Sequence, residues 1–255
     1  MGGRRTASKF LILFLETSFW HDRNMPTLTD NVLATLNEAI TACTLCPRLV
    51  HWREQVAQEK VKRFADWDYW GKPVPSFGST EAGLLIVGLA PAAHGANRTG
   101  RMFTGDNSGH WLYRALHKAG FASQAESVSA DDGLFLMNTR ISAVCHCAPP
   151  ANKPLPSEVK NCRGYLLSEL NEMPNLKVVL ALGKLAFDAV LQVYAETGHT
   201  LPKPKPVFGH NVTYTLPDGK ILIGSYHPSQ QNTFTGKLTE PMLDAVFTRI
   251  QQELT

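Results

Sequence analysis

Residues 84–90 read LLIVGLA, a short run that is apolar or small at every position. Such a run is typical of a strand that is buried on both faces of a sheet. It leads directly into GLAPAAHGANRTGRMFTGD, residues 88–106, which holds four glycines, two arginines, one histidine and one aspartate. The sequence therefore predicts a central strand that ends in a long polar loop, and this loop is the first candidate site.

Strands and helices alternate along the rest of the chain. KVVLALG (177–183) and ILIGSYH (221–227) repeat the buried-strand pattern, while residues 134–147 predict one long strand or two short ones. Helix starts are expected at Thr29, Ser108, Ser157, Lys184 and Thr239, and Pro47 is expected to stop the first helix. This alternation predicts an α/β fold, with a mostly parallel sheet covered by helices on both faces.

Polar stretches follow three of the predicted strands: GLAPAAHG (88–95), CAPPANKP (147–154) and HPSQQN (227–232). In parallel sheets, ligands bind beyond the carboxyl ends of the strands, so these stretches form the expected site. The glycines of 88–106 imitate a phosphate-binding P-loop, but that motif needs Lys-Ser or Lys-Thr after its last glycine. Arg101-Met102 stands there instead, and the glycines indicate tight turns and close approach to a flat ligand.

The composition fits one globular domain. The chain has 255 residues, of which 44% are hydrophobic and 18% charged, and its net charge is only +3. These values exclude a largely disordered chain and a strongly basic protein. Residues 25–255 are expected to form a single domain, and 1–24 a disordered extension or a mis-assigned start. No apolar run reaches the length of a membrane span.

Five cysteines leave three interpretations open; they are Cys43, Cys46, Cys145, Cys147 and Cys162. Cys43 and Cys46 form a C-x-x-C pair, whereas a structural zinc site commonly uses two such pairs. Iron–sulfur clusters accept wider spacings when four thiolates converge. Free buried thiols would explain Cys145 but not the pair. Spacing alone leaves cluster, zinc site and free thiols as alternatives.

Three motifs together resemble the iron–sulfur uracil-DNA glycosylases of the B type, also called family 5. They are the stretch 88–106, CAPPANKPLPSEVKNCR (147–163) and YHPSQQNTFTGKLT (226–239). The resemblance extends from about Cys43 to the C-terminal helix. It implies a three-layer α/β/α sandwich around a short, mostly parallel sheet. It also implies an enzyme that hydrolyses the C1′–N bond of uracil, and of other deaminated bases such as hypoxanthine, in DNA.

The resemblance further implies a cofactor and a setting. A [4Fe–4S] cluster would be held by Cys43, Cys46, Cys147 and Cys162, with Cys145 outside the ligand set, and we expect it to be structural. The expected partner is DNA that contains uracil or another deaminated base. We expect a monomer with no membrane attachment, in the cytosol of a bacterium or archaeon and associated with the nucleoid.

Two positions depart from related glycosylase families. Those families carry an Asp or a Glu in the first motif, where this chain has Leu89 and Ala90, neither able to act as a base. The Asn by which the A-type relatives read uracil is replaced by Ala143. The B type shares both departures and is similar in accepting a wider set of damaged bases.

The chemistry of glycosidic cleavage suggests roles for the polar residues of the motifs. The transition state carries positive charge on the sugar and negative charge on the departing base. Asp106 is the candidate to orient water beneath C1′, although an aspartate just before Ser108 could simply begin a helix. His227 is the candidate donor to the base carbonyl. Asn152 and Asn232 could read base edges or fix the water.

Other residues are expected to contact the base or the DNA backbone. Phe103 would stack on the flipped base, although a buried aromatic is more often core. Arg98, Arg101 and the basic segment 48–63 are expected to contact phosphates. The HPSQQN loop would press against the gap that the flipped base leaves. The remaining candidates in the two loops are Gly88, Ala90, Ala92, His94 and Ser229.

Two other classes of protein stay as alternatives. A non-enzymatic iron–sulfur or zinc module that binds DNA would use the cysteines and the basic segment but would not need Asp106 or His227. A nucleotide-binding α/β enzyme would bind ATP or GTP. Release of the base from a uracil-containing duplex would distinguish a glycosylase from both of these alternatives.

Overall fold

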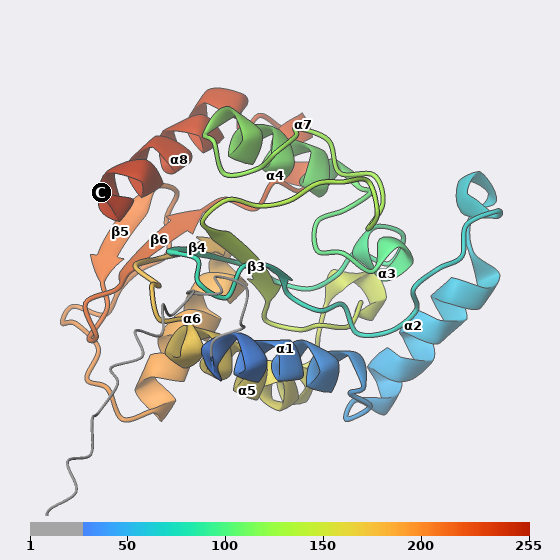
Figure 1. Ribbon diagram of the computed structural model, residues 1–255, viewed down its shortest axis with the longest axis horizontal. Helices are drawn as coiled ribbons and strands as arrows, with labels where there is room; N and C mark the ends of the chain where they lie inside the picture. The colour runs from blue at the N-terminus through green and yellow to red at the C-terminus, as the bar shows by residue number, and fades with distance from the viewer. Residues whose placement is uncertain (1–27) are drawn as a thin grey trace, which may run out of the picture.

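The computed structural model describes residues 28–255, so the extension expected at 1–24 lies outside the described residues. A six-stranded sheet with the order β1-β3-β2-β4-β6-β5 runs through its centre (Figure 1). The strands are β1 (Phe77–Gly78), β2 (Leu84–Gly88), β3 (Thr139–Ala143), β4 (Val178–Leu182), β5 (Val212–Thr215) and β6 (Ile221–Ser225).

The four central strands, β3, β2, β4 and β6, are parallel to one another. All residues of β2 and β4 are buried, which explains their continuous apolar sequences. The edge strands β1 and β5 pair antiparallel with their neighbours and are only partly buried. Because one side of an edge strand has no neighbouring strand, these segments lack the buried-strand pattern and the sequence does not predict them.

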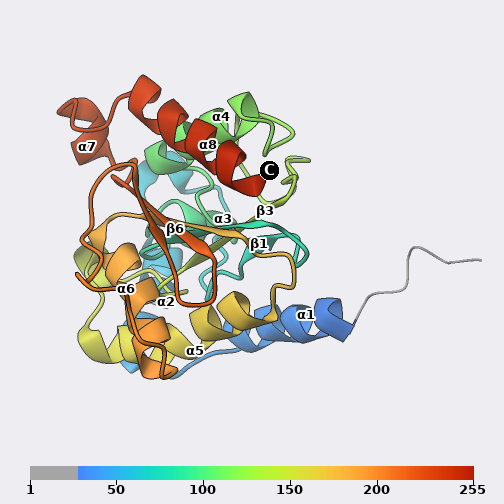
Figure 2. The ribbon, with the colours of Figure 1, turned by 90° about the vertical axis from the view of Figure 1, so that its left-hand side faces the viewer.

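Helices cover both faces of the sheet, which confirms the expected three-layer sandwich. In Figure 1 and Figure 2, α4 and α8 lie on one face, and α1, α5 and α6 lie on the other. No helix within residues 28–255 has the length and apolar character needed to cross a membrane. The helices are α1 (Leu28–Thr41), α2 (Pro47–Glu59), α3 (Ala96–Thr99), α4 (Asn107–Lys118), α5 (Pro156–Glu172), α6 (Lys184–Glu196), α7 (Gln230–Phe234) and α8 (Glu240–Leu254), with 3-10 turns η1 (Lys62–Phe64) and η2 (Pro150–Asn152).

Alternate residues of each central strand build two separate cores. Leu84 and Ile86 of β2 pack on the α4 and α8 side, whereas Leu85 and Val87 pack on the α5 and α6 side. This follows from the period of two along a strand. The covering helices each turn one apolar face to these cores: the buried residues of α5 include Cys162, Leu166 and Leu170, and those of α8 are Leu243, Val246, Phe247 and Ile250.

The loops differ from the sequence prediction in several places. Helix α1 ends at Thr41, and Pro47 begins α2 instead of stopping a helix, because proline is favoured in a first helical turn. A short helix, α3, precedes Ser108, and Asp106 rather than Ser108 is the N-cap of α4. Within residues 134–147, only the five residues of β3 form a strand.

Candidate active site

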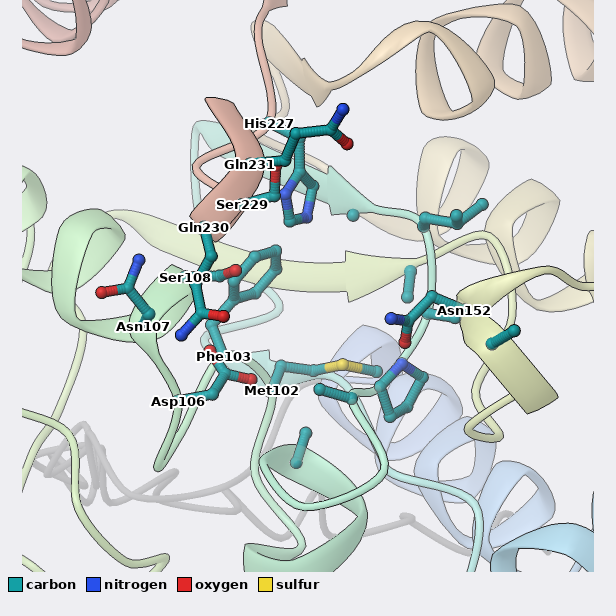
Figure 3. Close-up of a pocket in the computed structure, with 18 residues that line it drawn as sticks. Met102, Phe103, Asp106, Asn107, Ser108, Asn152, His227, Ser229, Gln230 and Gln231 are labelled. Carbon is teal, nitrogen blue, oxygen red and sulfur yellow. The ribbon is translucent and has the colours of Figure 1, made fainter. Parts of the chain in front are cut away.

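A cavity of about 590 Å³ opens at the carboxyl ends of the central strands. Gly88 ends β2, Ala143 ends β3, and His227 lies just beyond β6, so the three strands supply one wall each. Figure 3 shows Asp106, His227 and Asn152 approaching this cavity from three different sides. The three polar stretches that the sequence places after its strands therefore meet at one site, as parallel strands require.

Asp106 is held at the cavity by two local features. Its Oδ1 accepts a hydrogen bond from the backbone N–H of Gly109 at 2.9 Å, which caps α4. A Cβ atom added to Gly95 would lie 2.2 Å from Asp106 Oδ2, so only glycine fits beneath the carboxylate. Burial raises the pKa of Asp106, and the N–H groups of Gly109 and Ser108 oppose this rise. The carboxylate is thus both a helix cap and a desolvated group that lines the cavity.

His227 approaches the cavity from another side (Figure 3). Its ring centroid is 5.8 Å from that of Phe103, at an interplanar angle of 31°. Burial lowers the pKa of His227 to about 4, so the imidazole is neutral at physiological pH. The Nδ2 of Asn232 donates to the His227 carbonyl at 2.8 Å and holds its backbone. His227 can therefore donate one hydrogen bond into the cavity without carrying a charge.

Phe103 forms a flat apolar wall. Its ring lies against Gly88, where an added Cβ would come within 2.9 Å of two ring atoms. Phe103 also has a φ of 53°, a conformation that is unusual for a bulky residue. Backbone strain of this kind concentrates at functional sites, because packing elsewhere must hold it in place. The glycine at the end of β2 thus makes room for a planar side chain rather than for a phosphate.

Asn152 extends into the cavity from the side opposite Asp106 (Figure 3). It ends η2, in which Ala151 and Asn152 have consecutive φ values of 52° and 55°. Asparagine tolerates this left-handed conformation better than alanine does. Within residues 28–255, the Asn152 carboxamide has no hydrogen-bond partner. It is therefore available to a ligand.

The structure brings most of the predicted site residues together. Those that line the cavity are Gly88, Ala90, Ala92, Phe103, Asp106, Asn152, His227 and Ser229. Asn232 does not line it and acts behind the loop, on the His227 backbone. His94 does not line it either; its Nδ1 lies 3.1 Å from the Tyr69 hydroxyl.

The two arginines expected at the DNA surface are buried, and this corrects the sequence prediction. Arg101 is 4% exposed and forms a bidentate ion pair with Asp132, at 2.7 and 2.9 Å. Its Nη2 also donates to Ser127 at 2.7 Å. Every guanidinium nitrogen of Arg101 thus has a partner within the protein, which leaves none for a phosphate.

Arg98 is 3% exposed and lies between two aromatic rings. Its guanidinium carbon is 3.8 Å from the ring centroid of Phe64 and 4.0 Å from that of Trp67. Its Nε donates to the His94 carbonyl and its Nη2 to the Gly105 carbonyl. Arg98 therefore ties together the two halves of the loop that carries Asp106, instead of facing solvent.

Sequence reasoning missed some residues that line the cavity. Three polar ones, Asn107, Ser108 and Gln230, lie at the starts of α4 and α7 and line the cavity, although the Asn107 amide points toward Thr233 of α7 (Figure 3). They could have been predicted from the sequence, because they lie next to Asp106 or within the HPSQQN motif. The others are Pro91, Ala96, Met102, Ala151 and Gln231, whereas Leu89 and Ala143, which the comparison with related families had singled out, also line the cavity.

Four of the five cysteines lie on the segments where α2, α5 and the loop after β3 meet. Cys43 and Cys46 precede α2, Cys147 follows β3, and Cys162 belongs to α5. Cys46 and Cys147 share a buried cluster with Leu49. Within residues 28–255, no three His, Cys, Asp or Glu side chains surround one point closely enough to hold a single metal ion.

Comparison with known proteins gives a consistent result. The sequence profile of the Uracil DNA glycosylase superfamily matches residues 75–251. A Type-5 uracil-DNA glycosylase of Mycobacterium bovis is 51% identical over 216 residues, which are 84% of this chain and 79% of that protein. One of Thermus thermophilus is 48% identical over 205 residues, 80% of this chain and 90% of that protein. One of Pyrobaculum aerophilum is 43% identical over 207 residues, 81% of this chain and 87% of that protein.

Proposed function

Because the chain belongs to the uracil-DNA glycosylase superfamily and is a DNA-repair glycosylase, we propose that it releases hypoxanthine and other deaminated bases as well as uracil. The observation that carries this proposal is the cavity itself, in which a carboxylate, a neutral imidazole and a free carboxamide face one space beside a flat aromatic wall. A non-enzymatic DNA-binding module would not need these three polar groups in a cavity.

Different polar groups of the cavity stabilise the positive and the negative charge of the transition state. The target nucleotide must first leave the duplex, since stacking hides its glycosidic bond. Asp106 then orients water beneath C1′ and offsets positive charge on the sugar, while His227 donates to the base carbonyl that gathers negative charge. Asn152 contacts the base edge or the water, and Phe103 stacks on the base.

The breadth of substrates rests on the size and lining of the cavity. Ala143, at the end of β3, presents only a methyl group there, so no side-chain amide at this position selects a uracil edge. The cavity volume of about 590 Å³ is also ample for a purine.

A glycosylase panel tests the breadth directly. Uracil, hypoxanthine and xanthine should each be released from matched and mismatched duplexes under single-turnover conditions, with duplexes that contain no deaminated base as the control. Release of uracil alone would restrict the enzyme to one base. Release of no base would overturn the assignment of the cavity.

The cysteines support a [4Fe–4S] cluster on Cys43, Cys46, Cys147 and Cys162. Each thiolate of such a cluster binds its own iron, so four sulfurs need not surround one point. The Nη1 of Arg53 is 2.9 Å from Cys147 Sγ, and N–H donors at this distance suit a thiolate better than a thiol. When bound, the cluster would join the segment before α2 to α5 and the loop after β3, which is a structural role.

Iron content checks the ligand set. Cys147→Ser and Cys162→Ser should each lose most of the bound iron and lower the melting temperature, because they remove a ligand. Cys145→Ser should keep its iron, since Cys145 lies outside the proposed set. One zinc per chain and no iron in anaerobically prepared protein would contradict the cluster.

We propose that the turn after α2, rather than the buried Arg98 and Arg101, contacts the DNA phosphates. Lys62 and Arg63 of η1 are exposed, and the Arg63 guanidinium carbon stacks 4.2 Å from the Phe64 ring centroid. Beyond HPSQQN, α7 carries Phe234 with 78% of its surface exposed, an apolar side chain suited to an opened base step.

Neutralising the turn tests this docking face. Lys62→Ala/Arg63→Ala should weaken binding to uracil-containing and undamaged duplex almost equally, and should reduce the salt slope by about 2. Lys177→Ala/Lys220→Ala removes the same charge beside the amino ends of β4 and β6, away from the cavity, and should leave the slope unchanged. An unchanged slope in the first variant would remove the turn from the interface.

We also propose that the enzyme works as a monomer in the cytosol, where its DNA substrate would associate it with the nucleoid.

A further inference from the structure

We propose that Arg53 is a positioning residue of the iron–sulfur centre, where it binds the Cys147 sulfur and offsets the negative charge of the cluster. This inference rests on the proposed cluster. It gives a role to the buried guanidinium of Arg53, which does not line the active-site cavity.

The geometry of Arg53 connects the two cysteine-bearing segments. Arg53 lies on α2 and is 4% exposed. Its Nη1 donates to Cys147 Sγ at 2.9 Å and to the Cys43 carbonyl at 3.4 Å. One guanidinium thus holds the loop after β3 against the segment that precedes α2.

The charge of Arg53 lacks a buried counter-ion among the described residues. Glu54 Oε1 is 3.8 Å from its Nη2, but the Glu54 side chain is 53% exposed and therefore well screened. The Nε of Arg53 is buried and has no partner within residues 28–255. A buried cation is costly unless an anion accompanies it. Four thiolates on a cubane carry net negative charge, which supplies that anion beside Cys147.

The backbone of α2 at position 53 also contacts the loop beside the cavity, through Asn97, which is fully buried in α3. The Nδ2 of Asn97 donates to the Arg53 carbonyl at 3.3 Å and to the Ala93 carbonyl at 3.4 Å. Ala92 and Ala96 flank this contact and line the cavity. Helix α2 packs against α3 (Figure 1). Helix α2, which carries Arg53, thus contacts the first motif as well as the cysteine-bearing segments.

The test compares holoenzyme with variants at Arg53. In Arg53→Met, the reduction potential should become more negative, because the reduced cluster carries more negative charge. Iron affinity, measured by chelator competition, should fall about 10- to 100-fold, as for other groups that hydrogen-bond to metal ligands. Arg53→Lys keeps the charge but not the planar fork, so its potential should lie between those of wild type and Arg53→Met.

A double variant controls for general loosening of α2. Arg48 donates to Glu158 at 2.7 and 2.8 Å and ties the same helix to α5 without contacting a sulfur. Arg48→Met/Glu158→Gln should keep the wild-type potential. If Arg53→Met is not soluble, a wild-type potential and iron affinity in Arg53→Lys would overturn the proposal. If wild type binds iron and Arg53→Met has the same reduction potential and iron affinity, the role of Arg53 is refuted and the cluster is not. If wild type binds no iron, the proposed cluster is refuted together with the role of Arg53.

Discussion

Replacing Asp106 by Asn is expected to slow the release of every base by a similar factor, about 10²- to 10⁴-fold, in an enzyme that keeps its fold. The two roles of Asp106 can be separated because Asn is as good an N-cap as Asp. The Asn oxygen can accept the Gly109 N–H that Oδ1 accepts now. What the variant loses is the negative charge that would orient water and offset the charge at C1′. Single-turnover rates on uracil and hypoxanthine duplexes, with melting temperatures, measure both roles.

The pH dependence gives this prediction a second measurement. Burial raises the pKa of Asp106 above that of an ordinary aspartate. Only the ionised carboxylate can offset positive charge, so the wild-type rate should fall as the pH drops through this raised pKa. The fall should begin at a higher pH than an exposed aspartate would produce. Asp106→Asn should lack it.

Glycine variants provide matched controls for Asp106. Gly95→Ala should reproduce most of the loss, since its new Cβ would displace the carboxylate from a position only 2.2 Å away. Gly164→Ala, in α5, adds a Cβ that meets no atom within 4 Å and should leave the rates unchanged. Near-normal rates in Asp106→Asn would show that the carboxylate serves only to begin α4.

Replacing His227 by Ala is expected to change the order in which bases are released. The loss should be about 10²- to 10³-fold for the poorest leaving group and smaller for good ones. Burial holds the pKa of His227 at about 4, so this residue acts as a neutral hydrogen-bond donor. The benefit of such a donor grows with the negative charge that the departing base must carry. Single-turnover rates across a series of bases measure this dependence.

Two further observations bear on His227. The wild-type pH profile should show no step from His227 near the ordinary histidine pKa, because the ring stays neutral there. Asn232→Ala, which frees the His227 backbone, should shift the substrate order in the same direction but less. Binding to uracil-containing duplex should survive both changes, since phosphate contacts dominate affinity. Equal slowing of all bases in His227→Ala would assign the residue to the shape of the cavity instead.

The centre of this fold and the loops of its site can be predicted from the amino-acid sequence. Strands β2 and β4 are buried on both faces, and such strands are apolar at every position, so their pattern is visible locally. Because helices alternate with the strands, the strands run parallel to one another. Their carboxyl ends therefore lie at the same edge of the sheet. The order of strands and loops alone therefore predicted that the three polar stretches meet at one site, whereas the choice of Asp106, Asn152 and His227 also used the resemblance to the glycosylase motifs.

Which charged residues face solvent could not be predicted from the sequence and became clear from the three-dimensional arrangement. Arg101 and Asp132 are 31 residues apart, and Arg53 and Cys147 are 94 apart, so no local pattern distinguishes these arginines from surface ones. The edge strand β5 likewise depends on a partner, β6, for its structure. Periodicity reports which face of an element is covered. It carries no information about which distant side chain will meet a guanidinium, because chain folding brings the two together.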